Sequence, residues 1–123
     1  MKVSELTGIA LDYFVCEAAG MLRMIPGTME EKLGGYSPST NWRLGGPIIE
    51  RMIESGEFCV YEYNGIVTVS NHDPEGLPCK DPASENIARI EGQASTLLIA
   101  AMRAFVASKF GDEVDDAQPQ SAG

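Results

Sequence analysis

The fold class is decided by residues 57–70, which read Glu57-Phe58-Cys59-Val60-Tyr61-Glu62-Tyr63-Asn64-Gly65-Ile66-Val67-Thr68-Val69-Ser70. Two runs rich in β-branched and aromatic residues flank Asn64-Gly65, the pair preferred in a two-residue type I′ hairpin turn. This turn predicts antiparallel strands with Val60 opposite Val69. Both faces of the hairpin carry apolar side chains, so we expect each face to be covered by helices or by another subunit. An aromatic binding face with Tyr61 and Tyr63 is the alternative.

Helical patterns lie on both sides of the hairpin. Residues 4–20 predict a first helix with Thr7 as its cap. Residues 47–54 predict a second, short helix. The longest predicted helix starts at Ser95 or Thr96 and runs to about Phe110, and Gly111 ends it.

A third strand is expected at residues 86–91, paired with the hairpin. The sequence therefore predicts an α+β fold, a small single domain over residues 1–111. In it, an antiparallel hairpin or sheet packs with two short helices and one long C-terminal helix. Residues 112–123 contain four acids and no base, so we expect them to form an acidic, disordered tail.

Composition limits the partners. The chain has 123 residues and a formal net charge of -9, which disfavours direct binding to a nucleic-acid backbone because that affinity comes from Lys and Arg. No apolar run approaches the length of about 20 residues that spans a bilayer, and the start of the chain does not resemble a signal peptide. We expect no nucleic-acid partner, no membrane and a location in a cytoplasm.

The chain shows no pattern typical of a metal or catalytic centre. Cys16, Cys59 and Cys79 are an odd set without paired spacing, and we interpret them as reduced thiols of an intracellular protein. Together with His72 they would make four zinc ligands, but no CxxC or HxxxH spacing supports such a site. His72 and Asp73 are adjacent in a turn-rich loop, where one rarely orients the other as a catalytic base. We predict no catalytic residue, metal or cofactor.

The candidate binding site is residues 36–51, which read Tyr36-Ser37-Pro38-Ser39-Thr40-Asn41-Trp42-Arg43-Leu44-Gly45-Gly46-Pro47-Ile48-Ile49-Glu50-Arg51. Ser39, Thr40 and Asn41 are competent turn or cap residues, and Pro47 suits the first position of a helix. A Gly45-Gly46 segment ahead of that helix would leave free amides for an anion, beside the ring of Trp42 and the cation of Arg43. In the alternative, Trp42 fills the core and the glycines only turn the chain.

The long helix adds two further features. Ala100, Ala104 and Ala107 form a smooth face that would allow close approach of a second helix or of a dimer partner. Arg103 lies at the boundary of the apolar face, where its guanidinium can reach a bound anion or pair with an acid such as Glu50.

Three blocks of the sequence resemble the NinX family of bacteriophages and prophages, named from the nin region of lambda-like phages. The resemblance implies a phage origin and a location in the host cytoplasm, but no activity. Residues 57–92 match the family pattern poorly, and a second tryptophan is missing there. The blocks are Leu6-Thr7-Gly8 with Ala10-Leu11-Asp12; Tyr36 to Trp42 running into Gly45-Gly46-Pro47-Ile48-Ile49-Glu50; and Leu98 to Arg103 with Val106 to Lys109 and Gly111 to Val114.

We interpret the chain as a phage accessory protein that binds something of the host without catalysis. It would modulate or inhibit a host process such as antiviral defence, either as a protein inhibitor or as a sponge for a nucleotide-like signal. The partner is then a host protein or a small nucleotide-like ligand, and a homodimer is compatible with the sequence. The alternatives are a small hydrolase or transferase acting on a nucleotide-like substrate, and a phage structural or assembly protein.

The predicted ligand-binding residues come mainly from the candidate stretch. The same residues could instead form one structural knot that joins the loop, the second helix and the last helix. They are Tyr36, Ser39, Thr40, Asn41, Trp42, Arg43, Gly45, Gly46, Glu50 and Arg103.

Overall fold

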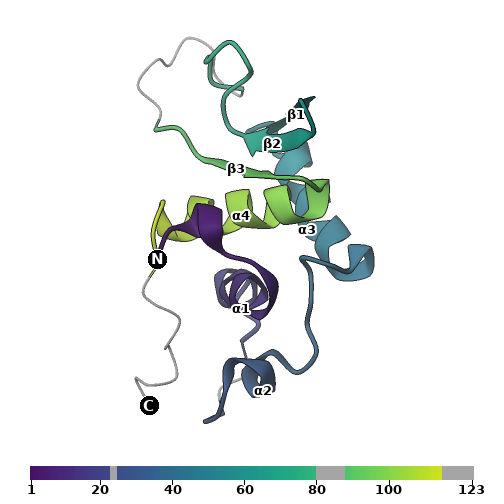
Figure 1. Cartoon of the computed structure of the whole chain (residues 1–123), viewed down its shortest axis with the longest axis vertical. Coiled ribbons are helices and arrows are strands. Elements are labelled where there is room, and N and C mark those ends of the chain that lie inside the picture. Colours follow the sequence, from purple (N-terminus) through teal and green to yellow (C-terminus); the bar gives the residue numbers. More distant parts are fainter. Residues whose placement is uncertain (23–24, 80–87, 115–123) are drawn as a thin grey trace.

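The computed structural model describes residues 1–22, 25–79 and 88–114 (Figure 1). It confirms the predicted α+β class: helices pack against one three-stranded antiparallel sheet. The sheet, α4, α1 and α2 are stacked in that order, and α3 stands at the side of the stack (Figure 1). The elements are a 3-10 turn η1 (Val3–Glu5), α1 (Gly8–Ala18), α2 (Met29–Leu33), α3 (Trp42–Glu54), β1 (Cys59–Tyr63), β2 (Ile66–Ser70), β3 (Glu91–Ala94) and α4 (Leu97–Phe110).

The hairpin forms as its sequence predicts. Val60 pairs with Val69, and Asn64 and Gly65 have φ angles of 53° and 83°, as a type I′ turn requires. The expected third strand is present and pairs with β2. It covers Glu91–Ala94 rather than residues 86–91, and residues 80–87 lie outside the described part.

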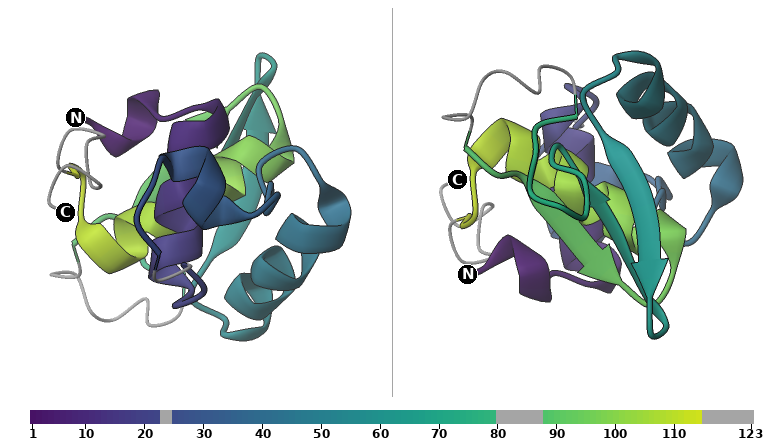
Figure 2. Two further views of the ribbon diagram at one scale, coloured as in Figure 1. Left: turned by 90° about the horizontal axis from the view of Figure 1, so that it is seen from below. Right: turned by 90° about the horizontal axis from the view of Figure 1, so that it is seen from above.

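Helix α4 supports the sheet from below because Gly92 lets the two approach closely. A Cβ atom at Gly92 would collide with the main chain at Ala100 O and Ala104 N. The smooth alanine face therefore packs against β3 of the same chain. The opposite face of the sheet lies at the top of the molecule (Figures 1 and 2). There Tyr63 is 76% exposed, whereas Thr68 and Ser70 of the same face are buried. This face is therefore open near the hairpin turn and covered further along β2 by the described chain, and cover by another subunit stays a prediction.

Helix α1 is buried on all sides over Leu11 to Cys16, because it lies between α4 and α2 (Figure 1). The predicted helix at residues 4–20 is in fact η1 followed by α1. Thr7 occupies the N-cap position of α1 with an extended backbone, but its side chain makes no capping hydrogen bond.

Two helical segments differ from the expectation. Helix α2 lies in a stretch where the sequence analysis assigned no helix, and Thr28 and Glu31 form a reciprocal capping box there. Helix α3 begins at Trp42 rather than Pro47, because Asn41 Oδ1 accepts a hydrogen bond from the Arg43 amide at 2.9 Å and caps it there. Helix α4 ends at Phe110 before Gly111, as predicted, but it begins at Leu97, because Thr96 is its N-cap rather than its first residue.

The two ends of the described chain lie side by side (Figure 1). The Val3 amide donates to Asp112 O, and the Val114 amide donates to Met1 O, both at 2.9 Å. Residues 112–114, which the sequence placed in the tail, thus pair with the N-terminus, and Val114 is buried. The rest of the expected tail, residues 115–123, lies outside the described residues.

The expectation of three reduced thiols is wrong for two of them. Cys59 and Cys79 form a disulfide, with their Cα atoms 6.4 Å apart, because the loop after β2 returns to the start of β1. Cys16 is a free, buried thiol. Within the described residues, no helix combines the length and apolar content that crossing a bilayer requires.

Candidate functional site

A cavity of about 1040 Å³ lies between α3 and the C-terminal half of α4. We call it the α3–α4 cavity. Its remaining walls are the C-terminal end of α1, residues 55–58, and Asn71 and Pro78 of the loop after β2, with Ile90 ahead of β3. The volume is slightly above the range of about 300–1,000 Å³ that is usual for small-molecule sites.

Basic side chains gather in this cavity. Among the described residues, Arg43, Arg51 and Lys109 line it together with one acid, Glu57, although the whole chain has 9 basic and 18 acidic residues. Arg43, Pro47 and Arg51 follow one another at i, i+4 steps and so share one side of α3. Within residues 1–22, 25–79 and 88–114, no carboxylate lies within 4.0 Å of either arginine. The cavity thus presents positive charge in an acidic protein.

Three aromatic rings accompany these cations: Tyr36, Phe58 and Phe105. Burial raises the pKa of the Tyr36 phenol, and nearby Cys16 and Asp12 add to this, while Arg51 opposes it. The phenol therefore stays protonated at neutral pH and can donate a hydrogen bond. Lys109 Nζ lies 5.9 Å from the centroid of the Phe105 ring, within cation–π range.

The two serine hydroxyls of the cavity are already bound to main chain. Ser55 Oγ donates to Met52 O at 2.7 Å and accepts from the Glu57 amide at 3.1 Å. Ser108 Oγ donates to Phe105 O at 2.6 Å. Neither contact involves a base that would turn a serine into a nucleophile.

His72 and Asp73 contact different partners. The His72 ring is buried, with Nδ1 2.7 Å from Asn71 Oδ1. Asp73 Oδ1 accepts from the amides of Glu75 and Leu77 and so stabilises its own turn. Among the described residues, no three His, Cys, Asp or Glu side chains gather as a metal site would need.

The free amides expected at Gly45-Gly46 are not formed. Both glycines lie inside α3, and the Gly45 amide donates to Asn41 O at 2.9 Å. Gly45 is needed for packing instead, because a Cβ atom there would meet Pro38 O and, at 2.7 Å, Leu98 Cδ1. A cradle of amides for an anion is therefore ruled out at this position.

Trp42 neither fills the core nor lines the cavity. Its side chain is 56% exposed, and the ring lies beside Gly46. Thr40 and Glu50 are also exposed and stand apart from the cavity walls. Of the predicted site residues, Tyr36 and Arg43 line the cavity.

Arg103 ties the body together rather than facing a ligand. Its Nε donates to Leu6 O at 3.0 Å, and a terminal nitrogen donates to Gln93 O at 2.6 Å. The pairing with Glu50, one of the two alternatives, is not formed, because the guanidinium is directed to these two carbonyls.

Ser39 and Asp12 join the candidate stretch to α1. The Ser39 amide donates to the buried Asp12 Oδ1 at 2.8 Å. Burial raises the pKa of the Asp12 carboxyl, and the amide and hydroxyl of Ser39 partly oppose this by favouring the charged form. The Ser39 hydroxyl lies buried without a hydrogen bond of good geometry to the described residues. Ser39, Gly45 and Arg103 thus fit the structural knot that the sequence offered as the alternative.

The sequence analysis missed most of the cavity. The missed residues that carry charge or a ring are Arg51, Phe58, Phe105 and Lys109. The i, i+4 spacing of Arg43, Pro47 and Arg51 was a usable signal, but only once α3 was known to start at Trp42. The contribution of α4 required the tertiary fold.

A comparison with known families settles the relationship of the chain. The family described as Bacteriophage P22, NinX, matches residues 2–109. The chain belongs to the NinX family. No curated protein matches it.

NinX membership confirms the resemblance carried by the three sequence blocks, and the structure shows what those blocks build. Asp12, Ser39, Gly45 and Arg103 all belong to them, and all make contacts that hold α1, α3, α4 and β3 together. The NinX blocks therefore account largely for the body of the domain. The cavity wall at Phe58, Asn71 and Pro78 lies outside the three blocks but inside the matched residues 2–109.

Proposed function

We propose that this NinX protein is a non-enzymatic binding protein of the phage that holds a small, anionic, ring-containing ligand of nucleotide type in the α3–α4 cavity. By withholding that ligand in the host cytoplasm it would modulate a host process such as antiviral defence. One observation carries the proposal: three of the nine basic side chains of an acidic chain line a single cavity.

The chemistry of the walls supports this ligand class. Arginine presents a planar fork of donors that matches phosphate oxygens, and Lys109 adds a point charge. Phe58 and Phe105 offer faces for a base, and the Tyr36 phenol offers a donor. Because the Ser55 and Ser108 hydroxyls are already bonded to main chain, the arrangement favours binding over turnover.

The test is a fluorescence titration with ATP that carries an N-methylanthraniloyl group on its ribose. We expect Arg51→Ala to weaken binding roughly tenfold or more, because hydrogen bonds to charged groups contribute about 1.5–3 kcal/mol. Arg89→Ala is the matched control, since Arg89 is exposed, pairs with Glu91 at 3.6 Å and stands apart from the cavity. Equal affinities for the two folded variants would overturn the proposal.

Two further measurements define the ligand. Unlabelled ATP should displace the probe better than inorganic triphosphate if the rings of the cavity recognise a base. Native mass spectrometry of protein purified gently from bacteria should show a bound mass that Arg51→Ala loses and Arg89→Ala keeps.

A second candidate is a protein inhibitor that docks through the outer side of α3. It is favoured by Trp42 and Ile53, which are 56% and 43% exposed and lie on one side of the helix together with Ile49. Here Trp42→Ala would abolish capture of a host protein while leaving the nucleotide probe bound. Capture that survives Trp42→Ala but fails in Arg51→Ala would contradict this candidate.

A further inference from the structure

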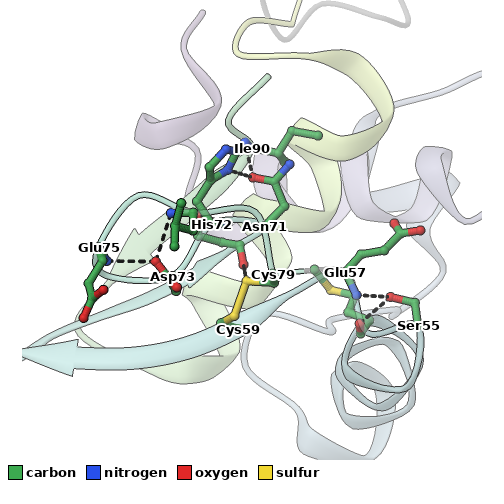
Figure 3. The surroundings of a disulfide bond; sticks show 12 residues. Ser55, Glu57, Cys59, Asn71, His72, Asp73, Glu75, Cys79 and Ile90 are labelled. Atoms are coloured by element: carbon green, nitrogen blue, oxygen red, sulfur yellow. Dashed lines mark hydrogen bonds between the residues drawn. A yellow bond between two sulfur atoms is a disulfide. The ribbon is translucent and has the colours of Figure 1, made fainter. Parts of the chain in front are cut away.

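The disulfide joins two walls of the α3–α4 cavity. Cys59 is the first residue of β1, and Cys79 ends the described part of the loop after β2 (Figure 3). The residue before each cysteine, Phe58 or Pro78, lines the cavity. The covalent bond therefore lies directly behind the wall of the proposed site.

The loop of residues 71–79 is anchored at Asn71. The Asn71 amide donates to Ile90 O at 3.0 Å, and Asn71 Oδ1 accepts from the Ile90 amide at 2.8 Å. The Cys79 amide donates to Asn71 O at 2.8 Å, and His72 forms a bridge with Pro78. These contacts join the two ends of the loop to each other and to the segment before β3 (Figure 3). The disulfide joins the loop to a different element, the start of β1.

The wall on the other side is the segment between α3 and β1. Ser55 accepts the Glu57 amide and anchors the start of this segment to α3. Strand β1 is at the edge of the sheet, paired with β2 alone among the described strands. Phe58 is thus held between the anchor at Ser55 and the disulfide at Cys59.

We propose that the Cys59–Cys79 pair is a redox-sensitive clamp on the α3–α4 cavity, and that its oxidised form is the one that binds ligand tightly. The inference rests on the proposed function for the identity of the ligand. A dithiol reductant supplies two electrons and two protons, the S–S bond breaks to give two thiols, and the reductant becomes a cyclic disulfide. Phe58 and Pro78 then lose their covalent connection, and the cavity must be ordered again when ligand binds.

In the host cytoplasm of the proposed function, such a clamp would serve as a redox sensor. Disulfides of cytosolic proteins are usually transient, and they serve in catalysis or in redox sensing. Cys59 and Cys79 are both half-buried, so a small dithiol can reach the bond. Cys16, by contrast, is 1% exposed and serves as an unreactive internal reference in the same chain.

The experiment compares three folded samples: the oxidised protein, the protein reduced with dithiothreitol, and Cys59→Ser/Cys79→Ser. Hydrogen exchange should become faster at residues 57–59 and 77–79 in the second and third samples, while α1 and α4 keep their protection. Affinity for the labelled ATP should fall roughly tenfold in both, a typical coupling between two sites, and reoxidation should restore it. Thiol alkylation should modify two cysteines after reduction and leave Cys16 unmodified.

The outcomes separate the clamp from the binding proposal. Identical exchange at residues 57–59 and 77–79 in the oxidised and reduced proteins would overturn the clamp, as would altered exchange with unchanged affinity. If labelled ATP binds none of the samples, the proposed function fails, and the exchange rates still decide whether the disulfide holds the two walls. The reduced wild-type protein covers the case in which the double variant does not fold.

Discussion

Arg103 and Arg51 lie on different helices, and their guanidinium groups meet different surroundings. Arg103 on α4 donates to two main-chain carbonyls, Leu6 O and Gln93 O. Arg51 on α3 faces the cavity, and no carboxylate lies within 4.0 Å of it in the described part of the chain. An arginine whose donors are bonded to carbonyls organises the fold, whereas one facing an open cavity keeps its donors for a ligand. The chemistry of the side chain is the same, and the acceptors around it decide its role.

The largest expected effect is a loss of stability where α4 packs against the sheet, in the part of the molecule that Arg103 helps to organise. Gly92→Val places a side chain against the main chain of α4 at Ala100 and Ala104, which cannot move without separating α4 from the sheet. We expect a loss of about 3 kcal/mol in the free energy of unfolding, measured by urea titration. Tyr63→Val, on the exposed end of the same sheet, should change stability by no more than about 0.5 kcal/mol. Similar losses for the two variants would contradict the close packing at Gly92.

The same substitution at the two arginines sharpens the comparison directly. Arg103→Met removes two charge-assisted hydrogen bonds and leaves the buried Leu6 carbonyl without that donor, so it should cost about 2 kcal/mol of stability. Arg51→Met should cost no more than about 0.5 kcal/mol, yet weaken binding of the labelled ATP. Urea unfolding gives the stability of each variant, and the titration gives its affinity for the labelled ATP. A stability loss at Arg51 as large as that at Arg103 would show that the two arginines do not differ in role.

The smallest expected effect is a pH dependence of stability at Asp12, the residue of α1 that binds Ser39 ahead of α3. Burial raises the pKa of Asp12 above its ordinary 3.8, so the folded state binds the proton more tightly than the unfolded state. The contribution of Asp12 to stability therefore falls as the pH rises from about 3.8 through the raised value. In Asp12→Asn this dependence is absent, while the amide oxygen can still accept from Ser39.

The measurement for Asp12 is the difference in unfolding free energy between Asp12→Asn and wild type, followed from pH 3 upward. The variant should gain on the wild type with rising pH. A difference that moves the other way would mean that the Ser39 contacts outweigh burial and lower the pKa of this carboxyl.

Local signals in the sequence were enough for part of the fold. The Asn64-Gly65 turn determines its own register, so the hairpin could be predicted residue by residue. Helix α4 carries both of its end signals, Thr96 and Gly111. Helix α2 had a signal as well, the Thr28 and Glu31 capping box, but five residues are too few to show a periodic pattern.

The prediction that α3 starts at Pro47 was wrong for a different reason. Gly45, Gly46 and Pro47 each lower helix propensity, and the Asn41 cap together with packing against α4 overrides them. Gly45 is in fact required inside the helix, since it passes against the Pro38 carbonyl. A sequence rule that treats a Gly-Gly-Pro run as a boundary therefore places the helix five residues late.

The candidate site could be predicted only where it coincides with one segment. Tyr36 and Arg43 were found because they lie in the candidate stretch. The rest of the cavity joins α1, α3, the loop after β2 and α4, and the disulfide links residues separated by 20 positions. The acceptors of Arg103 are likewise set by tertiary structure, because Leu6 is 97 positions away. Local periodicity and motif spacing do not predict contacts between residues so far apart in the chain.

The central place of α4 also bears on how the protein is made. Helix α4 packs against η1, α1, α3, β2 and β3, yet it is the last of all the described elements in the chain. During synthesis, η1, α1, α3 and the hairpin leave the ribosome before the surface that buries their apolar side chains exists. The body can therefore close only when translation has passed Phe110, and a host chaperone has the whole of that interval in which to hold the nascent chain.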